Sequence, residues 1–322
     1  MIEIFKSGSD GKLSAILPEV YEQEGFSVKD CWINLVNPSD REVDLISSLT
    51  GIEDEVLKAP LDDEERSRIE QEDDHLMVIV DMPVIDEEDD YYSYYTIPMG
   101  TFIKQNVIVT VSLRESTALR DFVRGKVKNF RTDLKTRFLY QMLYNIAARF
   151  LSYLKQIDKA SGRIQNELHK STKNKELIQM LDLENSLVYF ATSLSGNDAV
   201  ISRLLAIKNN RFLTAYDEEQ ELLEDVANET KQAIEMCTIY RDILSGTMDA
   251  YASVISNNQN SIMKTLAIIT LILAIPTFIA SLFGMNTWIP GGGKVWGFAL
   301  AIALSAVAVV VICLVLKRKK LL

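Results

Sequence analysis

Acidic residues are absent from the last 59 residues of this 322-residue chain, from Lys264 to Leu322. Six of the 34 basic residues lie there, so the first 263 residues hold 28 basic and all 45 acidic residues, a net charge of −17. This split is typical of an acidic soluble part joined to a membrane-embedded part. It argues against nucleic acid as a partner, because phosphate binding requires a basic face.

Cysteine is also scarce. Cys31, Cys237 and Cys313 are widely separated, which excludes a disulfide framework and a CxxC metal site. Free thiols fit a reducing compartment and favour a cytosolic soluble part. The N-terminal residues lack a basic segment followed by an apolar stretch, so no cleavable signal peptide is expected.

Sequence motifs for catalysis are missing. The chain has no GxxxxGK[ST] loop, so ATP is not predicted as a ligand. It also has no recognisable nucleophile–base pair and no metal triad. We therefore predict that the protein is not an enzyme.

Two uncharged apolar runs stand out in the acid-free region. The first, 266–283, has 18 residues, and the second, 295–316, has 22. About 20 helical residues span the ~30 Å core of a bilayer, and an open strand is excluded because lipid offers no hydrogen-bond partners. We therefore predict two transmembrane helices, at 263–283 and 295–316, joined by a loop at 284–294.

The basic residues around these helices predict their orientation. Lys264 precedes the first run, the tail at 317–322 begins with four consecutive basic residues, and Lys294 is the one charge in the loop. Under the positive-inside rule, the loop lies outside and both ends of the hairpin lie in the cytoplasm. The expected protein is a multi-pass protein of the cell membrane, in contact with lipid, with cytoplasmic N- and C-termini.

The region before the membrane begins with a predicted cytosolic α/β domain at 1–114. The segment 38–51 has helical spacing, with Ser39 at its start and Gly51 at its end. The charged segment 61–74 is expected on the surface, and 85–92 is expected to be an acidic hairpin turn. Runs rich in β-branched and aromatic residues predict strands at 32–36, 75–84, 91–103 and 106–113.

Helical periodicity dominates from residue 115 onward. Residues 115–216 predict cytosolic antiparallel helices, and residues 217–262 predict a stalk helix that continues into the first membrane helix. The fold class is therefore an α+β membrane protein with an N-terminal α/β domain, a long helical stalk and two C-terminal transmembrane helices. Two membrane helices cannot enclose an aqueous path, so transport would require several copies around one axis.

The triplet Gly284-Met285-Asn286 lies at the end of the first membrane helix, one short loop before the second. In this position it resembles the GMN motif of the CorA family of magnesium channels. Residues 260–286 align without gaps to the family's pore helix, and 224–259 are similar to its stalk. The resemblance implies a CorA-like funnel, a homopentamer and a passive channel for Mg²⁺, with Co²⁺ and Ni²⁺ as further candidate ions, driven by the membrane potential.

The resemblance also implies which residues act on the ion. The GMN triplet would select the hydrated ion, because neutral amides bind its waters without the deep well of a carboxylate ring. Asn260, Thr277 and Ser281 would line the pore, and Met263 would form a hydrophobic gate. Without the resemblance, Asn286 would be a polar helix cap and Met263 a packing or lipid-facing residue.

The family's regulatory Mg²⁺ site pairs two acids across a subunit boundary. Asp225 matches one of them, whereas Ala59 stands in place of the other, with Asp62 or Asp63 as candidate replacements. The resemblance therefore implies inhibition by intracellular Mg²⁺ as a regulatory ligand. A further departure is the loop at 284–294, which lacks the acidic residues that many members have there.

Two other functions stay open at this point. A zinc transporter of the related ZntB kind would favour His or Cys ligands, but His75 and His169 are isolated and far from the pore helix in sequence. A membrane-anchored adaptor would have no reason to keep Thr277, Ser281 and a terminal asparagine on one helix face.

Overall fold

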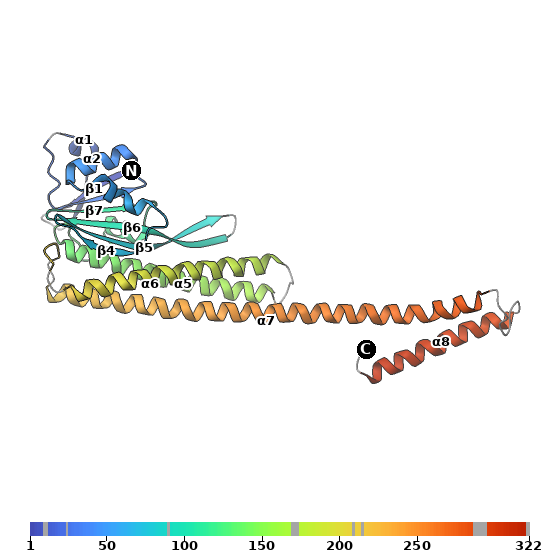
Figure 1. The fold of residues 1–322 in the computed structure, drawn as a ribbon. Coiled ribbons are helices and arrows are strands. Elements are labelled where there is room, and N and C mark those ends of the chain that lie inside the picture. The colour runs from blue at the N-terminus through green and yellow to red at the C-terminus, as the bar shows by residue number, and fades with distance from the viewer. Residues whose placement is uncertain are drawn as a thin grey trace. The chain divides into compact units, whose positions relative to one another are not determined.

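The computed structural model describes residues 1–8, 12–23, 25–88, 91–168, 174–207, 210–213, 216–285 and 295–319. Within it the chain forms two compact units, Met1–Met248 and Asp249–Leu322. The first unit is a β-sheet with helices on both faces, and the second contains two long apolar helices (Figure 1).

A seven-stranded sheet forms the centre of the first unit, in the order β2-β1-β3-β7-β6-β5-β4 (Figure 1). β3 and β7 pair in parallel, and the other neighbours pair antiparallel. The strands are β1 (Ile2–Ser7), β2 (Leu13–Ile16), β3 (Cys31–Val36), β4 (Arg68–Gln71), β5 (His75–Glu88), β6 (Tyr91–Lys104) and β7 (Val107–Ser112).

Strand β3 contributes to two separate cores, because successive side chains of a strand point to opposite faces of the sheet. Ile33 and its alternate neighbours pack on the face covered by α2 (Asp40–Thr50), α3 (Asp54–Lys58) and the short η1 (Ala59–Leu61). Trp32 points to the other face, where its ring centroid lies 6.2 Å from that of Phe122 and 5.0 Å from that of Phe138. These two rings belong to α4 (Thr117–Val123) and α5 (Lys135–Leu168).

Helix α2 begins and ends at the predicted residues. Ser39 and Glu42 form a capping box at its start, which satisfies two backbone N–H groups that have no partner within the helix. Gly51 follows its end with φ of 68°, the left-handed conformation that glycine adopts without a steric penalty.

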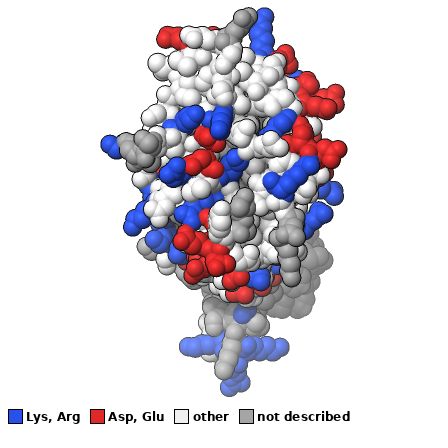
Figure 2. Space-filling model, turned by 90° about the vertical axis from the view of Figure 1, so that its left-hand side faces the viewer, with Lys and Arg blue, Asp and Glu red and all other residues white. Residues whose placement is uncertain are grey.

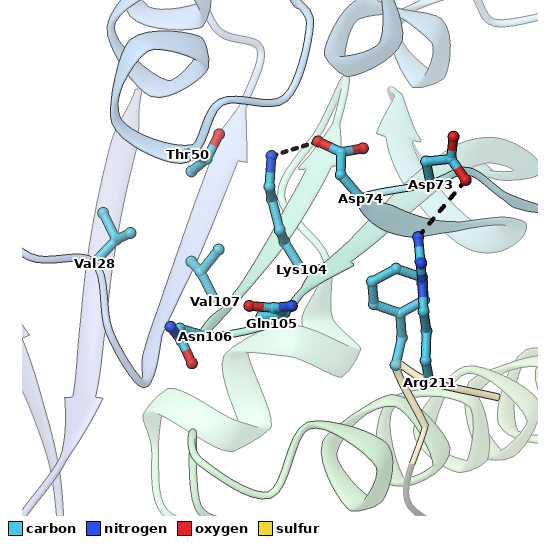
Figure 3. A pocket seen from close by; sticks show the side chains of 10 residues that line it. Val28, Thr50, Asp73, Asp74, Lys104, Gln105, Asn106, Val107 and Arg211 are labelled. Atoms are coloured by element: carbon cyan, nitrogen blue, oxygen red, sulfur yellow. Dashed lines mark hydrogen bonds and ion pairs between the residues drawn. The ribbon is translucent and has the colours of Figure 1, made fainter.

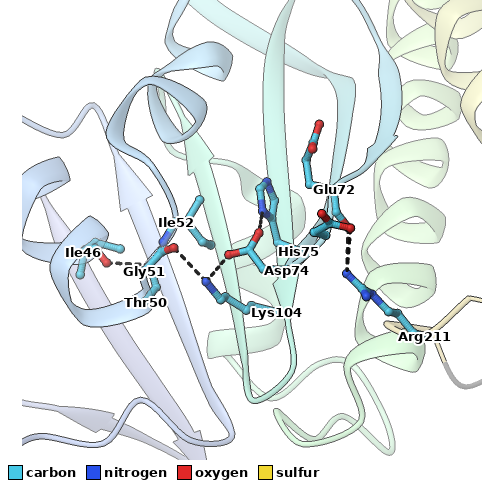
Figure 4. Close-up of polar contacts among 10 residues, drawn as sticks. Ile46, Thr50, Gly51, Ile52, Glu72, Asp74, His75, Lys104 and Arg211 are labelled. Atoms are coloured by element: carbon cyan, nitrogen blue, oxygen red, sulfur yellow. Dashed lines mark hydrogen bonds and ion pairs between the residues drawn. The ribbon is translucent and has the colours of Figure 1, made fainter.

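A lysine on β6 connects the end of α2 to the sheet (Figure 4). Lys104 Nζ lies 2.8 Å from the carbonyl oxygen of Gly51 and 2.5 Å from Asp74 Oδ2. The other oxygen of Asp74 lies 2.7 Å from His75 Nδ1. The hydrogen bonds from Lys104 and His75 lower the pKa of Asp74 to about 2, so this carboxylate is ionised at neutral pH.

Long helices complete the first unit: α5, α6 (Asn174–Ala206) and the first part of α7 (Asp217–Phe283). Asn197 of α6 joins the sheet, since its side chain donates to the carbonyl oxygen of Asp81 and accepts from the same residue's N–H, both at 2.8 Å. Arg137 of α5 pairs with Glu219 of α7 at 2.8 Å. The short α1 (Pro18–Tyr21) precedes β3.

The second unit contains the end of α7 and helix α8 (Val295–Arg318). On each helix, residues three or four positions apart are half-buried. On the last part of α7 they are Ile268, Ile272, Ile275, Pro276, Ile279 and Phe283. On α8 they are Ala301, Ser305, Ala308, Val309, Ile312, Cys313 and Leu316, following the buried Gly297. Because these two helices are all that the structure describes of this unit, each stripe lies on the side of its helix that faces the other helix.

The predicted fold class is confirmed: a mixed α/β region, a long helix and two apolar helices are present. Three strands were not predicted, namely β1, β2 and β4. β5 continues to Glu88 and β6 starts at Tyr91, so the predicted turn at 85–92 is mostly strand; Asp89 and Asp90 lie outside the described residues.

Candidate functional site

The predicted pore residues lie on one face of the last part of α7. At about 3.6 residues per turn, Asn260, Met263, Thr277 and Ser281 fall on the side of the helix away from the half-buried isoleucine stripe. All four are exposed in the single chain, and Met263 retains 64% of its side-chain surface. Helix α8 therefore leaves this face uncovered.

The hydroxyl group of Thr277 is held by the backbone of its own helix. Thr277 Oγ1 donates to the carbonyl oxygen of Leu273 at 2.8 Å. This bond uses its hydrogen and leaves its oxygen lone pairs as acceptors. A hydroxyl held in this way can accept hydrogen bonds from water on an ion, but it cannot supply negative charge.

Helix α7 ends at the GMN triplet. The N–H of Gly284 donates to the carbonyl oxygen of Ala280 at 3.0 Å, and that of Met285 donates to Leu282 at 3.3 Å, so the last turn tightens. Gly284 does not have a positive φ, and a Cβ at this position would lie 3.4 Å from the Ala280 oxygen, an ordinary contact. No contact among the described residues therefore demands glycine at this position.

The key asparagine of the triplet, Asn286, lies outside the described residues, as does the remainder of the loop to Lys294. Its role therefore stays a prediction. The described residues supply the helix end that precedes it.

The predicted regulatory acids are exposed. Asp62 Oδ1 accepts a hydrogen bond from the N–H of Glu64 at 3.1 Å, so it shapes a local turn. Asp225 is exposed on α7. Burial is the largest cause of the raised pKa of Tyr144, and the negative charge of Asp225 raises it further. The described part of the chain has no group of three or more His, Cys, Asp and Glu residues that could hold a metal ion.

Ala59, the position where the family has an acid, ends α3. Its neighbour Lys58 pairs with Asp40 at 2.7 Å. A cation therefore lies next to the position where a metal-binding carboxylate would otherwise be. Ala59 itself has no side-chain oxygen and therefore supplies no side-chain ligand to a divalent cation.

A cavity of about 400 Å³ lies beside Lys104 (Figure 3). Lys104 reaches Asp74 at 2.5 Å and Arg211 reaches Asp73 at 4.0 Å, so the two cations and two anions that line it balance. Figure 2 shows one end of the first unit, where basic and acidic side chains are likewise interspersed. This cavity has no surplus of acids that would attract a divalent cation.

Comparisons with known proteins agree with the fold and the membrane helices. The model of the CorA-like Mg²⁺ transporter protein family matches residues 29–318. The cobalt/magnesium transport protein CorA of Methanocaldococcus jannaschii is 27% identical over 99% of both chains. The complete structure of the CorA magnesium transporter from that organism has a TM-score of 0.80 and covers 99% of this chain and 98% of its own.

A more distant neighbour is the cytoplasmic domain of ZntB from Vibrio parahaemolyticus. It is 12% identical, covers 80% of this chain and 97% of its own, and has a TM-score of 0.59, so it shows a similar fold alone.

The fold and the two apolar helices are those of a membrane protein that transports ions. Proteins of this class are not enzymes. Because the family model spans most of the chain, this protein belongs to the CorA-like Mg²⁺ transporter family.

Proposed function

We propose that several copies of this chain, five by analogy with the family resemblance, surround one axis and form a passive channel for Mg²⁺ and related divalent cations. The observation that supports this most is the uncovered polar face of α7, which lies away from the stripe facing α8. A divalent ion gains roughly 4.6 kcal/mol on entering a cell held at 100 mV, at ~2.3 kcal/mol per charge. The potential therefore suffices as the driving force.

Exposed apolar residues on the first part of α7 support assembly from several copies. Ile239 and Ile243 are 54% and 56% exposed although they lie in the acidic, water-soluble unit. Packing between α7 helices of neighbouring subunits would bury them, as apolar side chains are buried between the helices of a coiled coil. In this arrangement the termini are cytoplasmic and the 284–294 loop lies outside the cell membrane.

The selection of ions follows from the chemistry of the helix end. Mg²⁺ keeps its waters, so a ring of Asn286 amides would bind the hydrated ion through those waters. Gly284 would let neighbouring backbones or the ion approach closely, and no contact among the described residues requires a glycine there. Neutral ligands keep the binding weak enough for the ion to leave.

The cytoplasmic end of the same face would act as the gate. Met263 and Asn260 lie one turn apart on α7. A ring of methionine side chains can close a pore by excluding water. A ring of asparagines beside it would offer neutral oxygens to an ion that enters or leaves.

Inhibition by intracellular Mg²⁺ would follow from the charge of the soluble part. A net charge of −17 per subunit repels itself when subunits converge, and divalent ions between subunits would relieve this repulsion. Asp225 is the candidate for this role, with Asp62 and Asp63 as possible partners on the neighbouring subunit. Their exposure leaves all three accessible to such contacts.

Zinc transport is the less favoured function. Cys237 is buried, and burial raises its pKa to about 11, so it is a poor zinc ligand. Cys31 and His75 are also buried in the first unit, and His169 lies outside the described residues. None of the described Cys and His residues lies on the polar face of α7.

The test is Mg²⁺ uptake into liposomes that contain the purified protein. Asn286→Ala should abolish uptake while the assembly stays intact, because the amide is lost but packing is not. Asn228→Ala, at an exposed position on the soluble part of α7, is the matched control and should conduct normally. Wild-type uptake by Asn286→Ala would show that Asn286 is only a helix cap.

A further inference from the structure

A groove beside α4 consists of two adjoining cavities of about 280 and about 260 Å³, both bordered by Glu115, Arg120 and Arg124. Ligand pockets in proteins measure ~300–1,000 Å³, so the two together suit one small molecule. The first cavity is completed by Lys126 and Arg149, and the second by Glu3 and Asn34 from the sheet.

The first cavity has a surplus of positive charge. Four basic side chains line it, against the two acids Glu115 and Asp121. Glu115 pairs with Arg120, and Asp121 accepts hydrogen bonds from both Lys126, at 3.0 Å, and Arg149. Two positive charges are left over in a chain whose net charge is −11. The cavity of Figure 3, in contrast, has no surplus of either sign.

Arg124 supplies part of this surplus. Its side chain is exposed and makes no hydrogen bond or ion pair with the described part of the chain. Its backbone is held in place, because its N–H donates to the carbonyl oxygen of Arg120 at 2.9 Å. The guanidinium group is therefore available to a ligand that enters the groove.

Two of the other cations are fixed by a carboxylate. The side chain of Asp121 is 15% exposed. Burial raises its pKa, but hydrogen bonds from Lys126 and Arg149 outweigh this and lower the pKa below its ordinary value. Asp121 is thus ionised at neutral pH and keeps both cations at the cavity, which reduces the entropy lost when a ligand binds.

We propose that this groove binds a small phosphomonoester, such as a nucleoside monophosphate, with the phosphoryl group in the first cavity and the remainder of the molecule in the second. A phosphomonoester carries a charge of about −1.5 to −2 at pH 7, which matches the surplus of two. Guanidinium groups bind phosphate oxygens through paired hydrogen bonds. The site is separate from the ion pathway and does not depend on ion conduction.

The second cavity combines polar groups from the sheet with the apolar side chains of Trp32, Leu119 and Val123. Asn34 Nδ2 donates to Glu3 Oε2 at 3.0 Å, and Asn34 Oδ1 accepts from Thr110. The remaining lone pairs of Glu3 are acceptors for hydroxyl or amino groups. At about 260 Å³, this cavity suits the polar sugar and flat base of a nucleoside phosphate better than the two acyl chains of a phospholipid.

Isothermal titration calorimetry with adenosine monophosphate, on the full-length protein in detergent with excess EDTA, tests this proposal. EDTA removes divalent ions that could bridge phosphate to acidic residues. Saturable binding with a Kd below about 1 mM is expected, with no binding of adenosine, which lacks the phosphoryl group. Absence of saturable binding, or equal binding of adenosine, would overturn the proposal, as would tighter binding of dioctanoyl phosphatidic acid than of adenosine monophosphate.

Two variants with opposite expected effects guard against simple misfolding. Arg124→Ala should weaken binding at least tenfold, since one charge-assisted hydrogen bond is lost. Glu115→Gln should tighten it several-fold, because it releases Arg120 and adds one positive charge, and a misfolded protein cannot bind more tightly. Arg41→Ala, which removes an exposed arginine of α2 outside the groove, is the control. Unchanged affinity in both Arg124→Ala and Glu115→Gln contradicts the site.

Discussion

The two units of this protein are stabilised in different ways. In the first unit large side chains such as Trp32, Phe138 and Phe190 are fully buried, and burial from water supplies the main stabilisation. In the second, the most apolar 18-residue stretch of α7 has none of its residues buried within the chain. The comparison shows that the first unit carries its own core, whereas the apolar surface of the second stays uncovered within the described part of one chain.

The largest expected effect is on the free energy of unfolding, when one phenylalanine of each unit is replaced by alanine in separate variants. Phe138→Ala should lower the free energy of unfolding of the first unit by ~3–5 kcal/mol, because it removes a ring from the aromatic cluster around Trp32 and leaves a cavity. Phe278→Ala, at a side chain that is 64% exposed, should leave that unfolding unchanged. Denaturant unfolding of the full-length protein in detergent, followed by circular dichroism, measures both. Equal losses would mean that the units do not differ as described.

A second pair of variants compares how much the polar face of α7 and the rest of the helix contribute to Mg²⁺ uptake. Thr277→Val should reduce Mg²⁺ uptake about two- to tenfold, because it removes one neutral acceptor worth ~0.5–1.5 kcal/mol. Thr265→Val removes an equivalent hydroxyl, which donates to Ser261 at 2.9 Å but lies on a different face, and should leave uptake near the wild-type rate. If the two variants conduct alike, the face has no special role.

Acidic residues of the first unit should inhibit the ion flux through the second unit when they bind intracellular Mg²⁺. Asp225→Asn should raise the Mg²⁺ concentration that half-inhibits flux by a few-fold, because a ligand shifts an equilibrium only through its differential affinity for the two states. The shift is expected to be modest, since Ala59 removes the second acid of the pair. Dye-reported flux at graded internal Mg²⁺ measures it, and unchanged inhibition would place the sensor elsewhere.

The smallest effect concerns acid stability within the first unit. The folded-state pKa of Asp74 is lowered to about 2, so its contribution is present above the unfolded pKa of ~3.9 and is lost as the pH falls towards 2. Because the side chain is 52% exposed, solvent screening limits this contribution to ~1 kcal/mol or less. The midpoint temperature of thermal unfolding of Asp74→Asn should lie below that of the wild type at pH 6 and match it near pH 2. A difference that persists at pH 2 would show that the shape of the Asp74 side chain, and not its charge, is responsible for the change in stability.

Much of this architecture was predictable from local sequence patterns. The apolar runs of α7 and α8, the capping residues Ser39 and Gly51, and the aromatic strand segments all carry short-range signals. β4 was missed because it lies in a highly charged segment, where only Ile69 is buried. β2 is a four-residue edge strand with no buried residue. β1 lies between β2 and β3, but only its Ile4 and Phe5 are buried. Neither strand therefore has the longer apolar or aromatic run from which a strand is predicted.

The candidate site was less predictable than the fold. The spacing of Asn260, Thr277 and Ser281 predicts a shared face, but only the structure relates that face to the stripe that packs on α8. The groove beside α4 combines residues from β1, β3, α4 and α5. Such a long-range juxtaposition has no signal in the local sequence, and so the surplus of positive charge there was not predicted.

The central claim is that copies of this chain form a passive path for divalent cations. Mg²⁺ uptake by liposomes containing only the purified wild-type protein, with a potassium gradient and valinomycin to set the potential, tests it most directly. The account predicts that uptake rises with an inside-negative potential and needs neither ATP nor a proton gradient. Uptake that does not respond to the potential, or that equals that of protein-free liposomes, would contradict it.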